Sequence, residues 1–443
     1  MNVTLIPKFR IQLPYRAFAS IIISMVHHKT QEKFDPRQRA IEVVQKLHAA
    51  GFQAFFAGGC VRDQIMGSPP EDYDIATSAR PEQVLRLFPR SAQVGAAFGV
   101  VMVKLRGRSM EVATFRSDGV YSDGRRPDSV EFTTAEQDAQ RRDFTCNGLF
   151  FDPIRKVLID YVGGQADIGA KILRAIGDPA QRFREDHLRM MRAIRFAARF
   201  GFTIEPTTWA AIADNAAHLS DISRERIGQE FRKILIHSQR HSAVNLLIDS
   251  GLLNSFWSGP LKPNSAANTL KRLTALPATS SFPVALAALI LDLAPSLHED
   301  STISIDHIPR LQNNLALSGL ETQYTQWLLT NLPLLEHWQN MRLAAFKRLL
   351  AHAWSDELLV LYATGHADDE KATLLTQRLR ELKAQPLAPD RFVTGDDLIL
   401  LGAQPGVLFK TWLEELYDRQ LENEFPDRAS ALEAARKLIR QRY

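Results

Sequence analysis

Apolar side chains recur with two different periods along the first third of this chain. Over residues 37–50, Ala40, Val43, Val44 and Leu47 lie three or four positions apart, which predicts an amphipathic helix that Gly51 ends. Later runs alternate or are rich in β-branched and aromatic residues, which is typical of strands. The predicted elements are a strand at 52–57, a short helix from Gly58 to Met66, a helix at 81–88, strands at 100–105 and 110–115 joined as a hairpin at Gly107, and strands at 149–151 and 157–161.

After Arg174 the strand signals end, and Leu/Ala-rich amphipathic segments follow one another to the C-terminus. Pro-containing stretches at 263–265 and 385–389 predict linkers. The expected fold class is therefore α+β, with a mixed-sheet head followed by an all-helical neck, body and tail. We place the boundaries at 1–33 for an N-terminal extension, 34–172 for the head, 173–250 for the neck, and 251–443 for the body and tail.

Composition bounds this picture without changing it. The length of 443 residues suggests about three domains, and a hydrophobic content of 45% is ordinary for a folded protein with a core. The net charge of +4 is compatible with a polyanionic partner such as RNA but does not establish one. The two cysteines, Cys60 and Cys146, lie far apart in the sequence, so we expect buried thiols in a reducing cytoplasm and no disulfide framework.

The first 31 residues contain no acidic side chain, and they include an apolar run at 17–26. That run is shorter than the ~20 residues needed to span a bilayer, so we expect no membrane association. A basic, acid-free start is typical of a targeting segment or of a disordered extension upstream of a start at Met25. We favour the extension.

The strongest chemical signal is a Gly pair followed by paired carboxylates. Gly58 and Gly59 allow backbone amides to approach a phosphate closely, because no Cβ stands in the way. Asp72 and Asp74 are two residues apart in a strand-like Asp-Tyr-Asp-Ile pattern and would point to one face, where a divalent cation would offset their repulsion. Glu111 alone would be a solvated edge residue, but a hairpin beside the Asp72–Asp74 strand would bring it to the metal or make it a proton acceptor.

Two further clusters carry charge in suggestive patterns. In the segment 141–147, two guanidiniums can pair with triphosphate oxygens, and Asp143 can accept a hydrogen bond from a ribose hydroxyl. Arg-Arg-Asp is, however, also a common surface sequence at the start of a helix. In the segment 185–196, Asp186, Arg189, Arg192 and Arg195 recur every three residues and predict a stripe on one helix. The stripe is either a salt-paired solvent face or a base-reading site.

The base-reading interpretation has a chemical basis. A carboxylate beside a guanidinium presents an acceptor and a donor together. Cytosine and adenine share the complementary order, an amino group next to a ring nitrogen, whereas uracil and guanine present a carbonyl where the amino group should be. A pair formed by Asp186 and Arg189 would therefore admit C and A and reject U and G.

In this order, the blocks resemble the class II tRNA nucleotidyltransferase / bacterial poly(A) polymerase family. The resemblance extends from Phe52 to Leu235 and includes segments 160–164 and 223–235. It implies a polymerase β-like nucleotidyltransferase head, with Mg²⁺ held by Asp72 and Asp74 and with Glu111 as a third carboxylate. The nucleotide contacts that it implies are Gly58, Gly59, Arg62, Arg142, Asp143 on the ribose, Asp186 and Arg189 on the base, and Arg192 and Arg195 extending that site.

The resemblance leaves the reaction to be chosen within the family. Poly(A) polymerases of this family tend to carry a basic pair in a Val-Gly-Arg-Arg-Phe-like segment, where this chain has Ala96-Ala97, and a strongly basic tail, where residues 435–442 are only mildly basic. We therefore expect addition of CCA to the 3′ end of tRNA from CTP and ATP. The alternatives are an enzyme that adds only A and an inactive RNA-binding protein, and the intact Asp72, Asp74 and Glu111 argue against the latter.

Overall fold

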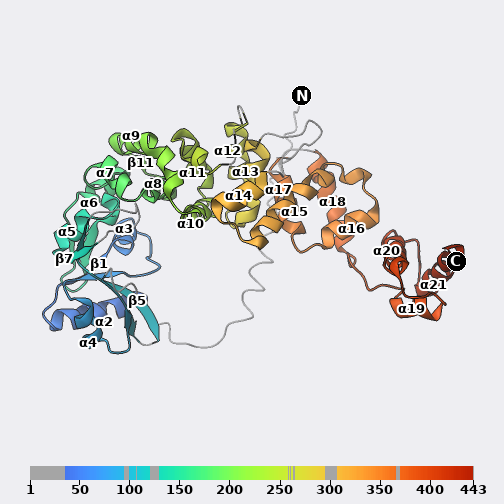
Figure 1. Ribbon diagram of the computed structural model, residues 1–443, viewed down its shortest axis with the longest axis horizontal. Coiled ribbons are helices and arrows are strands. Elements are labelled where there is room, and N and C mark those ends of the chain that lie inside the picture. Colours follow the sequence, from blue (N-terminus) through green and yellow to red (C-terminus); the bar gives the residue numbers. More distant parts are fainter. Residues whose placement is uncertain are drawn as a thin grey trace, which may run out of the picture.

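The computed structural model describes residues 35–93, 99–105, 107–119, 129–257, 259, 261–262, 265–294, 307–365 and 370–442. The N-terminal extension, the linker positions 263–264 and the segment 94–98, on which the choice between CCA and poly(A) addition partly rested, lie outside these ranges. Figure 1 shows an elongated chain, with the head sheet at one end, an arch of helices in the middle and the tail helices α19 to α21 at the other end. No helix within the described ranges is long and apolar enough to cross a bilayer.

A seven-stranded mixed sheet organises the head, in the order β3-β4-β5-β2-β1-β8-β9. Strands β2 and β5 run parallel with Ile75 opposite Val112, and the other neighbouring pairs are antiparallel. A separate two-stranded sheet joins β6 and β7. The strands are β1 (Ala54–Ala57), β2 (Ile75–Thr77), β3 (Ala92–Gln93), β4 (Val100–Leu105), β5 (Arg108–Thr114), β6 (Arg116–Asp118), β7 (Val130–Phe132), β8 (Leu149–Asp152) and β9 (Val157–Asp160).

One face of the head sheet is covered by helix α2, whose apolar stripe Ala40, Val43, Val44 and Leu47 is fully buried. On the other face, Phe55, Phe115 and Phe150 pack against helix α5. Helices therefore cover both faces of the sheet. Ala57 and Ala76 of the second face also line the cleft described below. The head helices are α2 (Pro36–Ala49), α3 (Gly59–Ile65), α4 (Pro81–Leu87), α5 (Ala135–Gln140), the 3₁₀ turn η2 (Thr145–Asn147) and α6 (Gly164–Ala170).

The predicted helices and strands of the head are confirmed to within two residues at most ends, including the β4–β5 hairpin with Gly107 between its strands. Three predictions are wrong. Asp72 and Asp74 precede strand β2 instead of lying in it. Strand structure continues past residue 174, because β10 (Ile172–Leu173) pairs in parallel with β11 (Thr203–Ile204). Asp186 lies before helix α8 and is not part of a helical stripe.

Helices form the rest of the described chain, as the Leu/Ala-rich pattern predicts. The division at 172/173 and 250/251 stays a prediction. The elements are α7 (Pro179–Glu185), α8 (Leu188–Phe200), α9 (Pro206–Asn215), η3 (Ala216–Asp221), α10 (Arg224–Leu235), α11 (Arg240–Asp249), η4 (Leu252–Ser255), α12 (Ala266–Ala275), α13 (Phe282–Leu293), α14 (His307–Leu315), α15 (Gly319–Glu336), η5 (Trp338–Asn340), α16 (Leu343–Ala351), α17 (Ser355–Ala363), α18 (Glu370–Lys383), α19 (Gly395–Leu400), α20 (Val407–Leu421) and α21 (Arg428–Arg442).

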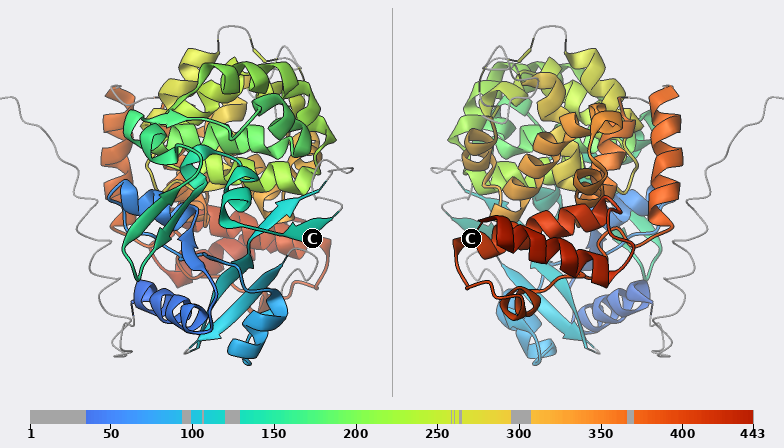
Figure 2. Two further views of the ribbon diagram at one scale, coloured as in Figure 1. Left: turned by 90° about the vertical axis from the view of Figure 1, so that its left-hand side faces the viewer. Right: turned by 90° about the vertical axis from the view of Figure 1, so that its right-hand side faces the viewer.

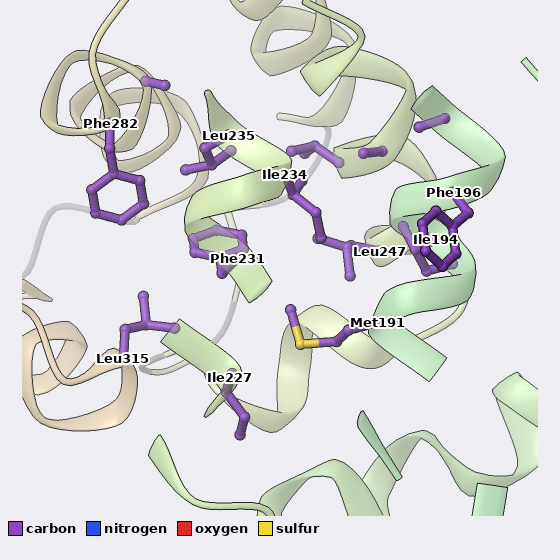
Figure 3. Close-up of a cluster of buried hydrophobic side chains, with 14 of the residues drawn as sticks. Met191, Ile194, Phe196, Ile227, Phe231, Ile234, Leu235, Leu247, Phe282 and Leu315 are labelled. Carbon is purple, nitrogen blue, oxygen red and sulfur yellow. The ribbon is translucent and has the colours of Figure 1, made fainter. Parts of the chain in front are cut away.

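Helix α10 is the centre of the neck and body packing. Figure 3 shows Ile227, Phe231 and Ile234 of this helix among side chains from α8, α11, α13 and α14. Its approach to α14 depends on Gly228, because a Cβ there would lie 1.9 Å from the carbonyl oxygen of Leu315. A continuous buried core therefore links the head-proximal helix α8 to the body.

The tail helices α19 to α21 have a core of their own, built around Trp412. In the right-hand view of Figure 2 they are the dark red helices in front. The segment before them is non-helical, which confirms the predicted linker at 385–389. The tail attaches to the body through α16, where Lys347 donates to the carbonyl of Leu421 at 2.8 Å and Arg348 pairs with Glu414 and Asp418 at 2.7 Å each.

Candidate active site

A cleft of about 610 Å³ lies between the head sheet and the start of helix α8. Its walls come from strands β2 and β5, the turn before α3, the segment after α5, and helices α8 and α10. Charged side chains dominate the lining. The residues that line it are Ala57, Gly58, Gly59, Arg62, Asp74, Ile75, Ala76, Val100, Glu111, Ala113, Arg116, Arg141, Arg142, Asp143, Asn147, Asp186, Leu188, Arg189, Arg192, Phe196 and Arg226.

The register of β2 and β5 brings the predicted carboxylates together. Because Ile75 faces Val112 across the parallel pair and both are buried, the preceding residues Asp74 and Glu111 lie side by side on the cleft face. The expectation that the hairpin lies beside the Asp72–Asp74 segment is therefore confirmed. Asp74 continues the sheet beyond β2, since its carbonyl accepts the amide of Ala57 at 3.0 Å. Asp72 is exposed and does not line the cleft.

The carboxylate of Asp74 lies in an unfavourable electrostatic setting. The Asp74 side chain is accessible, but protein atoms of the cleft replace much of its hydration. This desolvation, together with the negative charges of Glu111 and Asp72, raises the pKa of Asp74 to about 6, and the charge of Arg142 opposes the shift. Within the described ranges, no ion pair or side-chain hydrogen bond engages the carboxylates of Asp72, Asp74 or Glu111. Asp74 and Glu111 therefore offer neighbouring, unpaired carboxylate oxygens, the donor type that a hard divalent cation prefers.

The two arginines of the 141–147 segment are held by a buried acid that the sequence analysis did not single out. Asp138 is 1% exposed and pairs with Arg141 at 2.8 Å and with Arg142 at 2.9 Å. Although burial alone would raise the pKa of Asp138, these two guanidiniums lower it below its ordinary value. Asp138 precedes Arg141 by three positions and Arg142 by four. Oppositely charged residues at these spacings pair on a helix, so both ion pairs could have been predicted from the sequence.

The guanidinium of Arg62 is buried, and each of its three nitrogens already donates one hydrogen bond. It binds the Asp63 carboxylate at 2.6 Å and the Asn147 side-chain oxygen at 2.6 Å, and it lies over the ring of Phe200 at 4.3 Å. Arg62 therefore ties the turn at Gly58–Gly59 to the 3₁₀ turn η2 at the floor of the cleft.

Asp143 connects the head to helix α8. Its Oδ2 accepts Nε and Nη2 of Arg192 at 2.9 and 2.6 Å, while its Oδ1 accepts the Phe144 amide at 2.8 Å and the Asn147 side-chain amide at 3.0 Å. A carboxylate offers about four lone-pair positions, so all of them are used here. A contact with a ribose hydroxyl, as predicted, would require one of these bonds to be given up.

Asp186 and Arg189 both line the cleft, but they are not paired with each other. Asp186 accepts the Leu188 amide at 3.1 Å and Arg226 at 2.7 Å. Arg189 uses Nη1 for Glu185 at 2.7 Å, and in the described part of the chain its Nε and Nη2 have no partner. Each residue thus keeps hydrogen-bonding capacity toward the cleft. Arg226 comes from α10, forty residues away, and no local pattern indicates its role.

Arg195 lies outside the cleft lining. Its guanidinium pairs with Glu230 of α10, a carboxylate that is 3% exposed, and the residue does not line the cleft. The structure thus brings together ten of the twelve predicted site residues, leaving Asp72 at the edge and Arg195 behind helix α8. Cys60 and Cys146 are free and buried, as predicted, and burial raises the pKa of the Cys60 thiol to about 11.

Comparison with known proteins shows to which family the chain belongs. Residues 54–174 match the model of the poly A polymerase head domain, and residues 201–259 match that of a probable RNA and SrmB-binding site of polymerase A. A CCA-adding enzyme from Geobacillus sp. (strain WCH70) is 34% identical over 383 residues, which are 86% of this chain and 91% of the relative. The chain belongs to the CCA-adding enzyme family.

Other members of the CCA-adding enzyme family are also similar to this chain in sequence and structure. The enzyme from Geobacillus stearothermophilus is 44% identical over 225 residues, which are 51% of this chain and 55% of that protein, so this alignment spans about half of the relative's length. The crystal structure of the Bacillus stearothermophilus CCA-adding enzyme in complex with CTP has 30% identity and a TM-score of 0.74, covering 92% of this chain and 100% of that one.

A Thermotoga maritima CCA-adding enzyme complexed with tRNA shares the fold at 19% identity, with a TM-score of 0.65, over 91% of this chain and 96% of that one. Membership in this nucleotidyltransferase family implies use of a divalent cation. The unpaired carboxylates of Asp74 and Glu111, which line the cleft, are of the donor type that such a cation binds, whereas Asp72 lies outside the cleft lining.

Proposed function

We propose that this protein adds CCA to the 3′ end of tRNA, using CTP and ATP and releasing pyrophosphate. The observation that carries the proposal is the cleft itself. The cleft is lined by the carboxylate pair of the sheet, by several arginines, and by Asp186 and Arg189. The chain that forms it is similar to a CCA-adding enzyme over 86% of its length.

Asp72 and Asp74 would hold Mg²⁺, and Glu111 would serve as the third carboxylate. The bound ions would supply an activated 3′-hydroxyl and a neutralised triphosphate. The chain's own contribution is the placement of the carboxylates. Asp74 and Glu111 are fixed side by side by the register of two strands, so their repulsion is built into the fold and favours cation binding.

The phosphates would be bound at the turn of Gly58 and Gly59 and by Arg142. A Cβ at Gly58 would lie 3.0 Å from Nη1 of Arg142, so the glycine lets the guanidinium approach the turn. Asp138 holds Arg142 in place. Arg62, each of whose nitrogens donates to Asp63 or Asn147, would support the turn and add positive potential.

The base would be selected by Asp186 and Arg189, because a carboxylate and a guanidinium match the amino group and ring nitrogen that C and A share. Arg226 and Glu185 hold the two side chains in position. Arg192 would border the nucleotide while paired with Asp143, and Arg195, paired with Glu230, would fix helix α8 from behind.

The helices after the head would bind tRNA through phosphates and shape, since A-form RNA offers little base readout in its deep groove. A cytoplasmic location is part of this proposal, supported by two free, buried thiols.

The test uses purified protein, Mg²⁺ and a tRNA that lacks its 3′-terminal CCA, with labelled CTP and ATP offered singly and together. The proposal expects two C residues and then a single A. An open-ended ladder of A without C would instead establish an A-adding enzyme, and no incorporation at all would indicate an inactive RNA-binding protein.

Matched variants separate the roles of the side chains. Asp74→Asn should abolish incorporation while tRNA binding is retained, and Glu71→Gln, an exposed neighbour outside the cleft, should leave it intact. Arg189→Ala should relax the discrimination against UTP and GTP, whereas Arg184→Ala, exposed on α7, should not. Unchanged nucleotide choice in Arg189→Ala would refute the pairing idea.

A further inference from the structure

Outside the cleft, three potential metal ligands meet at the junction of α8 and η3. The ligand atoms of His187, His218 and Asp221 all lie within 4.8 Å of one another. Among the residues that the structure describes, this is the only such group of three His, Cys, Asp or Glu side chains. His187 is the N-cap residue, immediately before the first residue of α8, and the other two lie one turn apart in η3.

The geometry of the group is close to that of a coordination site. His218 Nδ1 and Asp221 Oδ2 are 3.3 Å apart, and the rings of His187 and His218 are stacked at 5.3 Å with an interplanar angle of 16°. Two ligands bound tetrahedrally at 2.0–2.1 Å are about 3.3 Å apart. The distance from His218 Nδ1 to Asp221 Oδ2 already has this length, and the other ligand atoms, all within 4.8 Å, would have to move closer to bind one ion.

Two features favour binding of a metal over a purely packed pair of rings. Nδ1 of His187 is buried and has no hydrogen-bond partner in the described part of the chain. Two imidazoles and a carboxylate form a ligand set that suits Zn²⁺ and similar transition-metal ions.

We propose that His187, His218 and Asp221 form a binding site for a divalent transition-metal ion of the Zn²⁺ type, with a fourth position open to water. The site is distinct from the carboxylates of the cleft, which are all-oxygen donors. A bound ion would join the N-cap residue of α8 to η3 and would fix the backbone beside Asp186. Any effect of the metal on nucleotide choice rests on the function proposed above, but metal binding itself does not.

The experiment measures binding of Zn²⁺ to the untagged, chelator-treated full chain by competition with a chromogenic chelator. His218→Ala is the main variant, because His218 is exposed and its loss should leave the fold intact. It should weaken the tightest Zn²⁺ site at least roughly tenfold, since loss of even an outer-shell partner costs that much. His187→Ala and Asp221→Asn should act in the same direction.

Control variants exclude other sources of Zn²⁺ affinity. Asp74→Asn should leave the tightest site unchanged, which separates it from the cleft, as should His337→Ala, an exposed histidine on another helix end. Co²⁺ in place of Zn²⁺ should give visible absorption bands that disappear in His218→Ala. If His218→Ala binds Zn²⁺ as tightly as the unmodified chain, or if Asp74→Asn removes the tightest site, the proposal is overturned whether or not the enzyme adds CCA.

Discussion

The ion pair between Asp143 and Arg192 should hold helix α8 against the head. Its perturbation is a double-mutant cycle with Asp143→Asn, Arg192→Met and the combined variant. Burial by itself would raise the pKa of Asp143, but Arg192 and the hydrogen bond from Asn147 outweigh it and bring the pKa down to about 2 from an ordinary 3.8. At ~1.4 kcal/mol per pH unit, the favourable interactions of the carboxylate exceed its desolvation by roughly 2 kcal/mol.

That value is an upper limit for the pair alone. The Arg192 side chain is 35% exposed, against 9% for Asp143, so solvent screens part of the attraction. Asn147 and the Phe144 amide supply another part. We therefore expect a coupling energy of about 1 kcal/mol between the two substitutions at pH 7.

The sign of the pH dependence follows from the depressed pKa. The stabilisation is fully present above the unfolded pKa near 4 and is lost as the pH falls through about 2. Hydrogen exchange of the α8 amides, followed by mass spectrometry, measures the coupling locally, without requiring the whole chain to unfold in one step. Coupling below ~0.3 kcal/mol at pH 7, or coupling as strong at pH 2 as at pH 7, would refute the reasoning.

Two further predictions concern the helical part. Gly228→Ala should destabilise the chain by roughly 2 kcal/mol, seen as a lower midpoint of thermal unfolding, because its Cβ would overlap the Leu315 carbonyl 1.9 Å away. Gly319→Ala, which meets nothing within 4 Å, should not, and equal midpoints for the two variants would contradict the packing argument. Arg240→Met should cost about 3 kcal/mol by urea unfolding, because this fully buried guanidinium donates to four backbone carbonyls, while exposed Arg184→Met should be neutral. A loss below ~0.5 kcal/mol would show that those carbonyls find other partners.

The sequence determined by itself those features that depend on neighbours along the chain. The spacing of Ala40, Val43 and Leu47 specifies a helix, because residues three and four apart share a face in any context. Gly107 between two β-rich runs specifies a hairpin for the same local reason. Several residues of the cleft lining could also be predicted, since Asp74, Glu111, Arg142 and Arg189 belong to short ordered motifs and all four line it.

Only the tertiary structure decided which side chains meet. Asp143 finds Arg192 across 49 positions, Asp186 finds Arg226 across 40, and Arg195 turns away from the cleft to Glu230. A periodicity argument puts Asp186 and Arg195 on one stripe, but the helix begins after Asp186 and rotates Arg195 toward α10. Local patterns fix the period of an element, whereas the partner of a charged side chain depends on how buried faces pack, and this is set by contacts remote in the sequence.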